Sequence, residues 1–144
     1  MSDPVQRLVD QLEIRELTAR YNRAFDDGDA EAYAATFVPD GEMHATGVPN
    51  TVGRDALKEL VRLTPYGIVH ITTDPVIEID GDRAIQRCTL IVANRHEDRS
   101  AVQFGTTGRY EDELVRTPDG WRFKKRVAVL DGDVAQQAAQ EAAQ

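Results

Sequence analysis

The fold is decided by the stretch Ile14-Arg15-Glu16-Leu17-Thr18-Ala19-Arg20-Tyr21-Asn22-Arg23-Ala24-Phe25-Asp26-Asp27-Gly28-Asp29. Its apolar residues recur at spacings of three and four, which predicts a helix with one face toward a core. They are Ile14, Leu17, Tyr21, Ala24 and Phe25. Tyr21 and Asp26 lie at the inner end of this face. A helix C-terminus and apolar neighbours both disfavour a charged carboxylate, which makes Asp26 a candidate general base. The alternative is a solvated helix end before Gly28.

The composition describes one globular domain. The chain has 144 residues and is 41% hydrophobic, which is enough to bury a core and hold a pocket. We expect this domain to span residues 4–131 and to be followed by a flexible Ala/Gln-rich tail over 132–144. There is no apolar run of about 20 residues and no leader pattern, so we expect a cytoplasmic protein.

The net charge of −8 argues against binding to nucleic acid or an anionic membrane surface, because phosphate binding needs clustered Lys and Arg. A small hydrophobic molecule is the expected partner. We expect no metal and no cofactor, because no His-Glu-x-x-His pattern, paired-carboxylate spacing or Gly-rich phosphate loop occurs. The single cysteine, Cys88, excludes an internal disulfide and reads as a small core residue. His44 and His96 read as surface residues.

The chain should begin with a helix, since Ser2 or Asp3 can cap it and Pro4 suits its first position. The first apolar residues of this helix point nearly opposite to the later ones, which predicts contact with another subunit. They are Val5, Leu8, Val9 and Leu12.

Two shorter helices and five strands are predicted after the first helix. Gly28 ends that helix, and Asp29 caps a second over Ala30–Phe37 that presents Tyr33, Ala34 and Phe37 inward. A turn at Pro39-Asp40-Gly41, a strand over Glu42–Thr46 and a third helix over Arg54–Leu63 follow. The four long strands are expected at Ile68–Ile79, Arg83–Arg95, Ala101–Arg116 and Trp121–Leu130. Short turns between them predict an antiparallel meander. The fold class is therefore α+β: three N-terminal helices packed into a strongly curved, mainly antiparallel sheet as a cone-shaped barrel with a pocket inside.

This order of elements, with its Tyr-x4-Asp, Pro-Asp-Gly, strand histidine and Asp-Gly-Trp-Arg-Phe segments, resembles the SnoaL-like branch of the nuclear transport factor two-like superfamily. The resemblance covers about Val5 to Asp131. It is strongest to the scytalone dehydratase, dehydrochlorinase and bile-acid dehydratase group, and it implies an α+β cone that eliminates water or HCl with a His–Asp pair. It also allows a homo-oligomer, either a trimer or a dimer.

The resemblance assigns the dyad carboxylate to Asp26 and the dyad base to His70, in Val-His-Ile-Thr-Thr-Asp. It assigns further catalytic roles to Tyr21 and Arg126. Scytalone dehydratase uses a second histidine; here the nearest residues are Asn94 and His96, and an asparagine cannot supply a proton at neutral pH.

Taken by themselves, these residues also have structural interpretations. A strand histidine such as His70 is usually a hydrogen-bonded structural residue, and Tyr21 could be core with its hydroxyl satisfied. Arg126 alternates with Arg122 and Lys124 as on a solvated strand face, and a bulge would be needed to turn it inward. The residues expected to line the pocket are Phe25, Tyr33, Phe37, Leu90, Val92, Asn94, Phe104, Thr106 and Tyr110.

The leading hypothesis is a cofactor-free, dehydratase-like lyase or isomerase. His70, oriented by Asp26, would take a proton from a polycyclic, steroid-like or polyketide-like substrate, and Tyr21 and Arg126 would stabilise the oxyanion or leaving group. The alternatives are a polyketide cyclase, a ketosteroid-isomerase-like enzyme, or a non-catalytic ligand-binding or assembly module.

Overall fold

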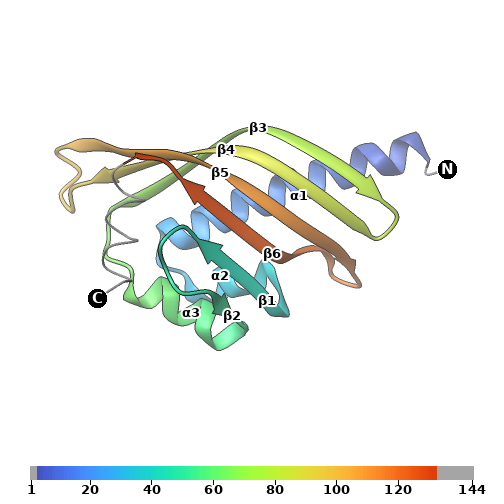
Figure 1. The fold of residues 1–144 in the computed structure, drawn as a ribbon, viewed down its shortest axis with the longest axis horizontal. Coiled ribbons are helices and arrows are strands. Elements are labelled where there is room, and N and C mark those ends of the chain that lie inside the picture. Colours follow the sequence, from blue (N-terminus) through green and yellow to red (C-terminus); the bar gives the residue numbers. More distant parts are fainter. Residues whose placement is uncertain (1–2, 133–144) are drawn as a thin grey trace.

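The chain folds as a long helix lying along a single six-stranded sheet, with two shorter helices near its first strands (Figure 1). The computed structural model describes residues 3–132, so residues 133–144 of the predicted tail lie outside the described part. The elements are α1 (Pro4–Asp26), α2 (Ala30–Ala35), β1 (Phe37–Ala45), β2 (Thr51–Val52), α3 (Arg54–Leu63), β3 (Ile68–Asp80), β4 (Arg83–Arg95), β5 (Val102–Thr117) and β6 (Gly120–Leu130). The α+β class predicted from the sequence is confirmed, and each long strand begins and ends within one residue of its predicted bounds.

The helices begin where their caps predict. Asp3 caps α1, because the main-chain nitrogen of Val5 donates to its carboxylate at 3.1 Å. Asp29 caps α2 in the same way through Ala32 N, at 3.0 Å. The prediction that the second helix continues to Phe37 was wrong: α2 ends at Ala35, and Phe37 begins β1. The reason is that Phe123 N, on β6, donates to Thr36 O at 2.9 Å and draws the chain into the sheet.

The sheet has the strand order β2-β1-β6-β5-β4-β3. Strands β3 to β6 form the predicted antiparallel meander, whereas β1 runs parallel to β6. The predicted turn at Pro39-Asp40-Gly41 does not separate two elements. It lies inside β1, where the register against β6 shifts between Phe37 and Glu42. Residues 39–41 therefore form an irregularity in one strand, and the short β2 pairs beyond it.

One extra residue in each of three strands interrupts the meander. The extra residue lies between Thr73 and Val76 in β3, at Gly105 in β5 and at Lys124 in β6. Each bulge reverses the side-chain alternation beyond it and increases the local twist. Curvature introduced in this way lets a sheet bend around a helix that lies along it.

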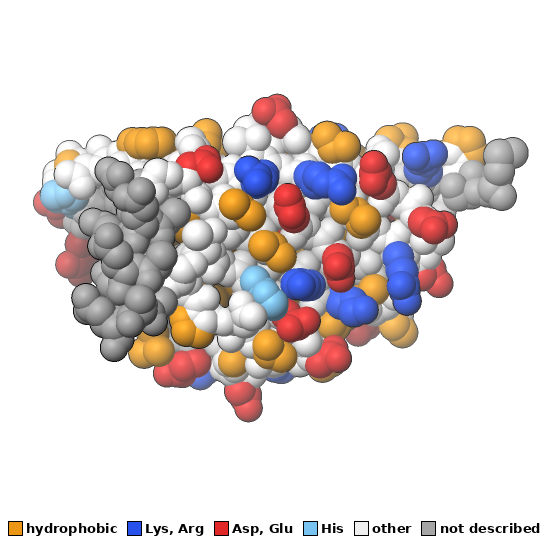
Figure 2. Space-filling view, viewed as in Figure 1, with side chains coloured by type: hydrophobic (Ala, Val, Ile, Leu, Met, Phe, Trp, Pro, Cys, Tyr) orange, Lys and Arg blue, Asp and Glu red, His pale blue; other side chains and the backbone are white. Residues whose placement is uncertain are grey.

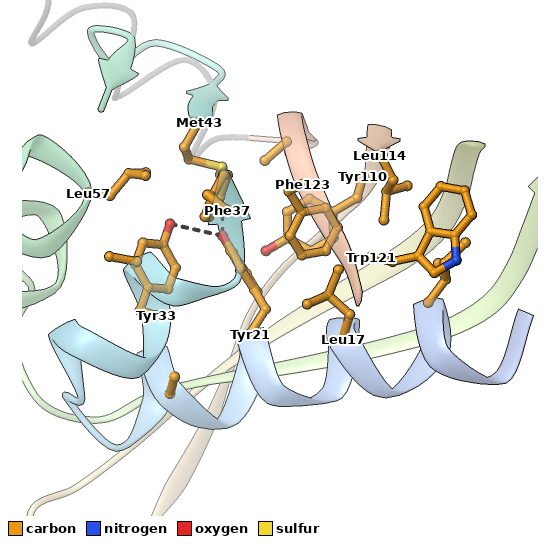
Figure 3. Close-up of a cluster of buried hydrophobic side chains, with 14 of the residues drawn as sticks. Leu17, Tyr21, Tyr33, Phe37, Met43, Leu57, Tyr110, Leu114, Trp121 and Phe123 are labelled. Atoms are coloured by element: carbon orange, nitrogen blue, oxygen red, sulfur yellow. Dashed lines mark hydrogen bonds between the residues drawn. The ribbon is translucent and has the colours of Figure 1, made fainter. Parts of the chain in front are cut away.

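Aromatic side chains fill the space between α1, α2 and the sheet (Figure 3). The ring of Tyr21 lies at the centre, and the ring centroids of Tyr33, Phe37, Tyr110 and Phe123 are 4.9 to 6.0 Å from its own. Each of these five side chains is at most 1% exposed. Tilted and edge-on pairs at such separations stabilise a core beyond the area they bury. This part of the predicted cone is therefore packed rather than hollow.

A second group of contacts fixes the first half of α1 to the β5–β6 hairpin. The buried Asp10 carboxylate accepts two hydrogen bonds from Arg116, at 2.7 and 2.8 Å, and one from Trp121 Nε1, at 3.1 Å. The Arg116 guanidinium also lies 4.6 Å from the centroid of the Trp121 ring system. One turn further along α1, Glu13 accepts from Trp121 N at 3.0 Å. Because Asp10 is 2% exposed, this charge depends on its partners.

The outer face of the meander carries many charged side chains, with exposed apolar side chains such as Ile71 and Ile85 among them. Figure 2 shows Lys and Arg side chains interspersed with Asp and Glu over the region where β4, β5 and β6 run in Figure 1. Arg87 lies 3.8 Å from Glu78, and Arg109 lies 3.5 Å from Glu111, as exposed ion pairs. Among residues 3–132, no helix is both long and apolar enough to cross a membrane.

Candidate active site

Asp26 and His70 meet where α1 ends and β3 begins. His70 Nδ1 lies 2.7 Å from Asp26 Oδ1, and the main-chain nitrogen of His70 donates to both carboxylate oxygens, at 3.2 and 3.0 Å. An ionised carboxylate only accepts, so the Nδ1 atom carries the hydrogen. The other ring nitrogen, Nε2, makes no hydrogen bond to a described residue. The side chains of His70 and Asp26 are 11% and 14% exposed, so the pair is sheltered but accessible.

Two glycines allow this meeting of helix and strand. Gly28 has a φ of +72° and ends α1 directly after Asp26 and Asp27. Gly67, with a φ of +115°, precedes β3, and a Cβ there would collide with the main-chain oxygen of Arg95. Arg95 N donates to Gly67 O at 2.8 Å, which holds the start of β3 against β4. The position of His70 therefore depends on a close approach that only glycine permits.

The pair borders an open cleft of about 640 Å³ that lies between α1, β3 and β4. We call it the α1–β3 cleft. Three pairs of side chains bridge from α1 to the strands at this cleft. Residues four apart on a helix share a face, as do alternate residues on a strand, so the helix members 18, 22 and 26 line up. The pairs are Thr18 with Gln86 (2.9 Å), Asn22 with Thr72 (3.0 Å) and Asp26 with His70 (2.7 Å).

Tyr21 and Arg126 do not line the α1–β3 cleft. Tyr21 points into the aromatic core, where its hydroxyl accepts from Tyr33 at 3.3 Å and lies 3.6 Å from Met43 Sδ (Figure 3). Burial raises the pKa of Tyr21, so its phenol is neutral at ordinary pH. The structure therefore does not bring Tyr21 to the His70 ring.

Arg126 lies inside the molecule, fully buried, rather than on a solvated strand face. The bulge at Lys124 reverses the alternation of β6, so Phe123 and Arg126 both point inward. The guanidinium binds Asp112 through Nε and Nη2, at 2.7 and 2.9 Å, and lies 3.7 Å from the ring centroid of Tyr110. Burial alone would lower the pKa of Arg126, but the Asp112 carboxylate raises it above its usual value. Arg126 is a permanent buried cation.

The residues expected to line the pocket are not among those that line the α1–β3 cleft. Tyr33, Phe37, Leu90, Thr106 and Tyr110 are buried, Val92 is partly buried, and Asn94 and Phe104 are exposed. Alternation placed Phe104 beside Thr106, but the bulge at Gly105 reverses the face and leaves Phe104 70% exposed. Two of these residues lie beside His70: the ring centroid of Phe25 is 4.9 Å from that of His70, and Val92 lies opposite His70 on β4.

The sequence interpretation missed Thr18, Asn22, Thr72 and Gln86, all of which line the cleft. A signal for two of these positions, Thr18 and Asn22, was present. Thr18, Asn22 and Asp26 form a polar stripe at four-residue spacing beside the apolar face of α1. Gln86 gave no signal, because one polar residue at an inward strand position looks the same as a chance interruption.

The remaining candidates are structural or exposed. Cys88 is 5% exposed, and burial raises the pKa of its thiol to about 11, so it is uncharged at neutral pH. His44 is partly buried, with its Nε2 3.3 Å from Glu42 Oε1, and His96 is exposed. Within residues 3–132, His, Cys, Asp and Glu form no group of three suited to a metal ion.

A protein-family model for the SnoaL-like domain matches residues 6–127, which is most of the chain. The chain belongs to the SnoaL-like family. This SnoaL-like domain is 30% identical over 132 residues to an uncharacterized protein of Mycobacterium tuberculosis, a match that covers 85% of this chain and 86% of the relative. The family predicted from the sequence is therefore confirmed.

Solved structures with the same fold agree. An NTF2-like protein with a cystatin-like fold from Novosphingobium aromaticivorans is 29% identical, with a TM-score of 0.81 and coverage of 96% of this chain and 97% of that one. A proposed scytalone dehydratase from the same organism is 24% identical, with a TM-score of 0.75 and coverage of 88% and 87%. At that identity the second likeness shows the fold alone.

Proposed function

We propose that this SnoaL-like domain is a cofactor-free lyase that eliminates water from a hydroxylated polycyclic ketone. The observation that carries the proposal is the Asp26–His70 pair, at 2.7 Å, because both residues line the open α1–β3 cleft and His70 Nε2 makes no hydrogen bond to a described residue. A histidine can accept a proton near neutral pH, and a carboxylate behind it stabilises the imidazolium that results.

The proposed reaction needs one proton carrier. His70 Nε2 takes a proton from the carbon between the ketone and the hydroxyl-bearing carbon, and the electron pair of that C–H bond forms the enolate. The enolate then expels the hydroxyl group, which breaks the C–O bond, and the imidazolium returns the proton to the departing oxygen. The products are an unsaturated ketone and water, and the enzyme regains its starting protonation state.

Tyr21 and Arg126 have a different role in this proposal from the one that the resemblance implied. Both side chains are at most 1% exposed and lie in the core. The Asp112 carboxylate links Arg126 to Gln86, which lines the α1–β3 cleft. Their role is therefore to hold the floor of the cleft in one arrangement.

The proposed scytalone dehydratase of N. aromaticivorans shares the fold, and its name is the reason to test the loss of water first. Isomerisation or cyclisation would use the same base without loss of a leaving group, and a binding module would use the cleft without proton transfer. Identification of the reaction product therefore distinguishes elimination from isomerisation, cyclisation and binding alone.

A bicyclic β-hydroxy ketone, 3-hydroxy-1-tetralone, is the substrate for the first test, because loss of water converts it to fluorescent 1-naphthol. We expect the wild type to accelerate this conversion and His70→Ala to reduce the rate by roughly 10²–10⁴-fold. His96→Ala is the matched control, since His96 is exposed and lies outside the cleft. Equal rates in the wild type and His70→Ala would reject the proposal.

A further inference from the structure

Gln86 is fully buried, yet one of its two polar side-chain atoms has no partner. The amide nitrogen donates to Thr18 Oγ1 and to Asp112 Oδ2, both at 2.9 Å. The carbonyl oxygen, Oε1, has no hydrogen-bond partner among the described residues. Buried polar atoms are nearly always paired, so this oxygen requires an explanation.

The orientation of the Gln86 amide is fixed by its neighbours. The Asp112 carboxylate accepts two hydrogen bonds from Arg126 and offers Gln86 a further acceptor, so it requires the NH₂ group of the amide. The Thr18 hydroxyl donates its hydrogen to Ile14 O, at 3.2 Å, and therefore also accepts from Gln86. Rotating the amide by half a turn would place the carbonyl against two acceptors. The oxygen is consequently held in one position.

This fixed oxygen belongs to a residue that lines the α1–β3 cleft. Two effects make it a good acceptor. It is carried on a strand and braced by Asp112 and Arg126, so little motion is lost when a ligand binds. Donation of the amide hydrogens to a carboxylate also polarises the amide and increases the negative charge on its oxygen.

Asn22 supplies a useful contrast. Its Oδ1 also lacks a partner, but its amide contacts only the hydroxyl of Thr72, which can donate or accept. The open atom at Asn22 can thus be either oxygen or nitrogen, whereas at Gln86 it must be oxygen. Only at Gln86 must the unpaired atom be an acceptor, so a ligand group that pairs with it must be a hydrogen-bond donor.

The charges of the cleft indicate the kind of donor. Its lining contains as many aspartates as arginines, so it does not favour an ammonium ion over a neutral group. They are Asp26, Asp27 and Asp74, and Arg15, Arg23 and Arg95. A hydroxyl group is a hydrogen-bond donor, as Gln86 Oε1 requires, and it is neutral, as the balanced charges of the cleft allow.

We propose that Gln86 Oε1 binds a hydroxyl group of the ligand in the α1–β3 cleft. As a statement about the elimination substrate, this rests on the proposed function; as a statement about binding, it does not. Gln86 selects hydroxylated ligands and sets their orientation relative to His70.

The experiment measures ligand binding in a variant that lacks the proposed base and therefore does not convert the ligand to product. In a His70→Ala background, calorimetry gives the Kd values for 3-hydroxy-1-tetralone and for its methyl ether, 3-methoxy-1-tetralone, which lacks the donor. We expect the alcohol to bind roughly three- to tenfold more tightly, as one neutral hydrogen bond allows. Adding Gln86→Met, which keeps the length of the side chain, should bring the ratio to about one. Gln103→Met, the same change at an exposed position, is the control and should keep the preference.

A second measurement does not depend on the variant folding. The side-chain amide signal of Gln86 in a nitrogen–proton correlation spectrum should shift with the alcohol and not with the ether. Equal Kd values for the two ketones, no binding of the alcohol at millimolar concentration, or a preference that survives Gln86→Met would overturn the proposal. Because binding is measured without His70, a failure of the elimination chemistry leaves this test intact.

Discussion

Asp112 and Arg126 form a bidentate ion pair in which both side chains are fully buried, with Nε to Oδ1 at 2.7 Å and Nη2 to Oδ2 at 2.9 Å. Gln86 adds a third hydrogen bond to the carboxylate, and the rings of Tyr21, Tyr110 and Phe123 cover the guanidinium. Every group in this network depends on another. Removing a single charge should therefore cost more than removing both.

We expect Arg126→Met to lower the free energy of unfolding by about 3–5 kcal/mol, because it leaves a buried carboxylate with Gln86 as its remaining partner. The double variant Arg126→Met/Asp112→Asn should recover a large part of this loss, since it buries no charge. Urea unfolding followed by circular dichroism measures both values. A double variant less stable than Arg126→Met alone would contradict this account of the pair.

The bulge at Lys124 shows where sequence reasoning ends. β-strand propensity and turn residues predict the four long strands well, because each strand is rich in β-branched and aromatic residues and is bounded by turn residues. The face of a given residue depends on the number of residues since the last bulge, and one insertion reverses it. Lys124 has no signature that separates a bulge from a regular strand position, whereas Gly105, a glycine inside a strand, is a residue that often marks a bulge. Alternation alone therefore places Arg126 and Phe104 on the wrong faces, and only the family resemblance indicated that Arg126 turns inward.

The pairing of strands that are far apart in the chain could not be predicted from the sequence either. Nothing in residues 37–45 indicates that β1 runs parallel to β6, because the partner lies some 80 residues away. The Asp26–His70 contact was predictable only through the family resemblance. The bracing of the cleft by Gln86 and Asp112 was not predicted at all.

The Asp10 site should make stability depend on pH in the acid range. Hydrogen bonds from Arg116 lower the pKa of Asp10 from 3.8 to about 2. The contribution to stability, about 2 kcal/mol, is fully present above pH 4 and is lost as the pH falls toward 2. Asp10→Asn should lose it at neutral pH and show a flatter dependence of Tm on pH between 4 and 2. Asp119→Asn, at an exposed turn position, should behave as the wild type.

The first half of α1 should form a subunit contact. Val5, Leu8, Val9 and Leu12 are 47–67% exposed, so this face is unpartnered within residues 3–132. We expect light scattering at micromolar concentration to give a multiple of 16.0 kDa, and Leu8→Glu/Leu12→Glu to give the monomer mass. Leu63→Glu changes another exposed leucine, on α3, and should leave the mass unchanged. A wild-type monomer would contradict the prediction.

The last prediction concerns the coupling between Asp26 and His70. Asp26→Asn keeps the shape of the side chain but removes the charge that stabilises the imidazolium, so kcat on 3-hydroxy-1-tetralone should fall. The carboxylate acts only through His70, to which it is bound at 2.7 Å. The double variant Asp26→Asn/His70→Ala should therefore be scarcely slower than His70→Ala alone. Losses that multiply in the double variant would show that the two residues act separately.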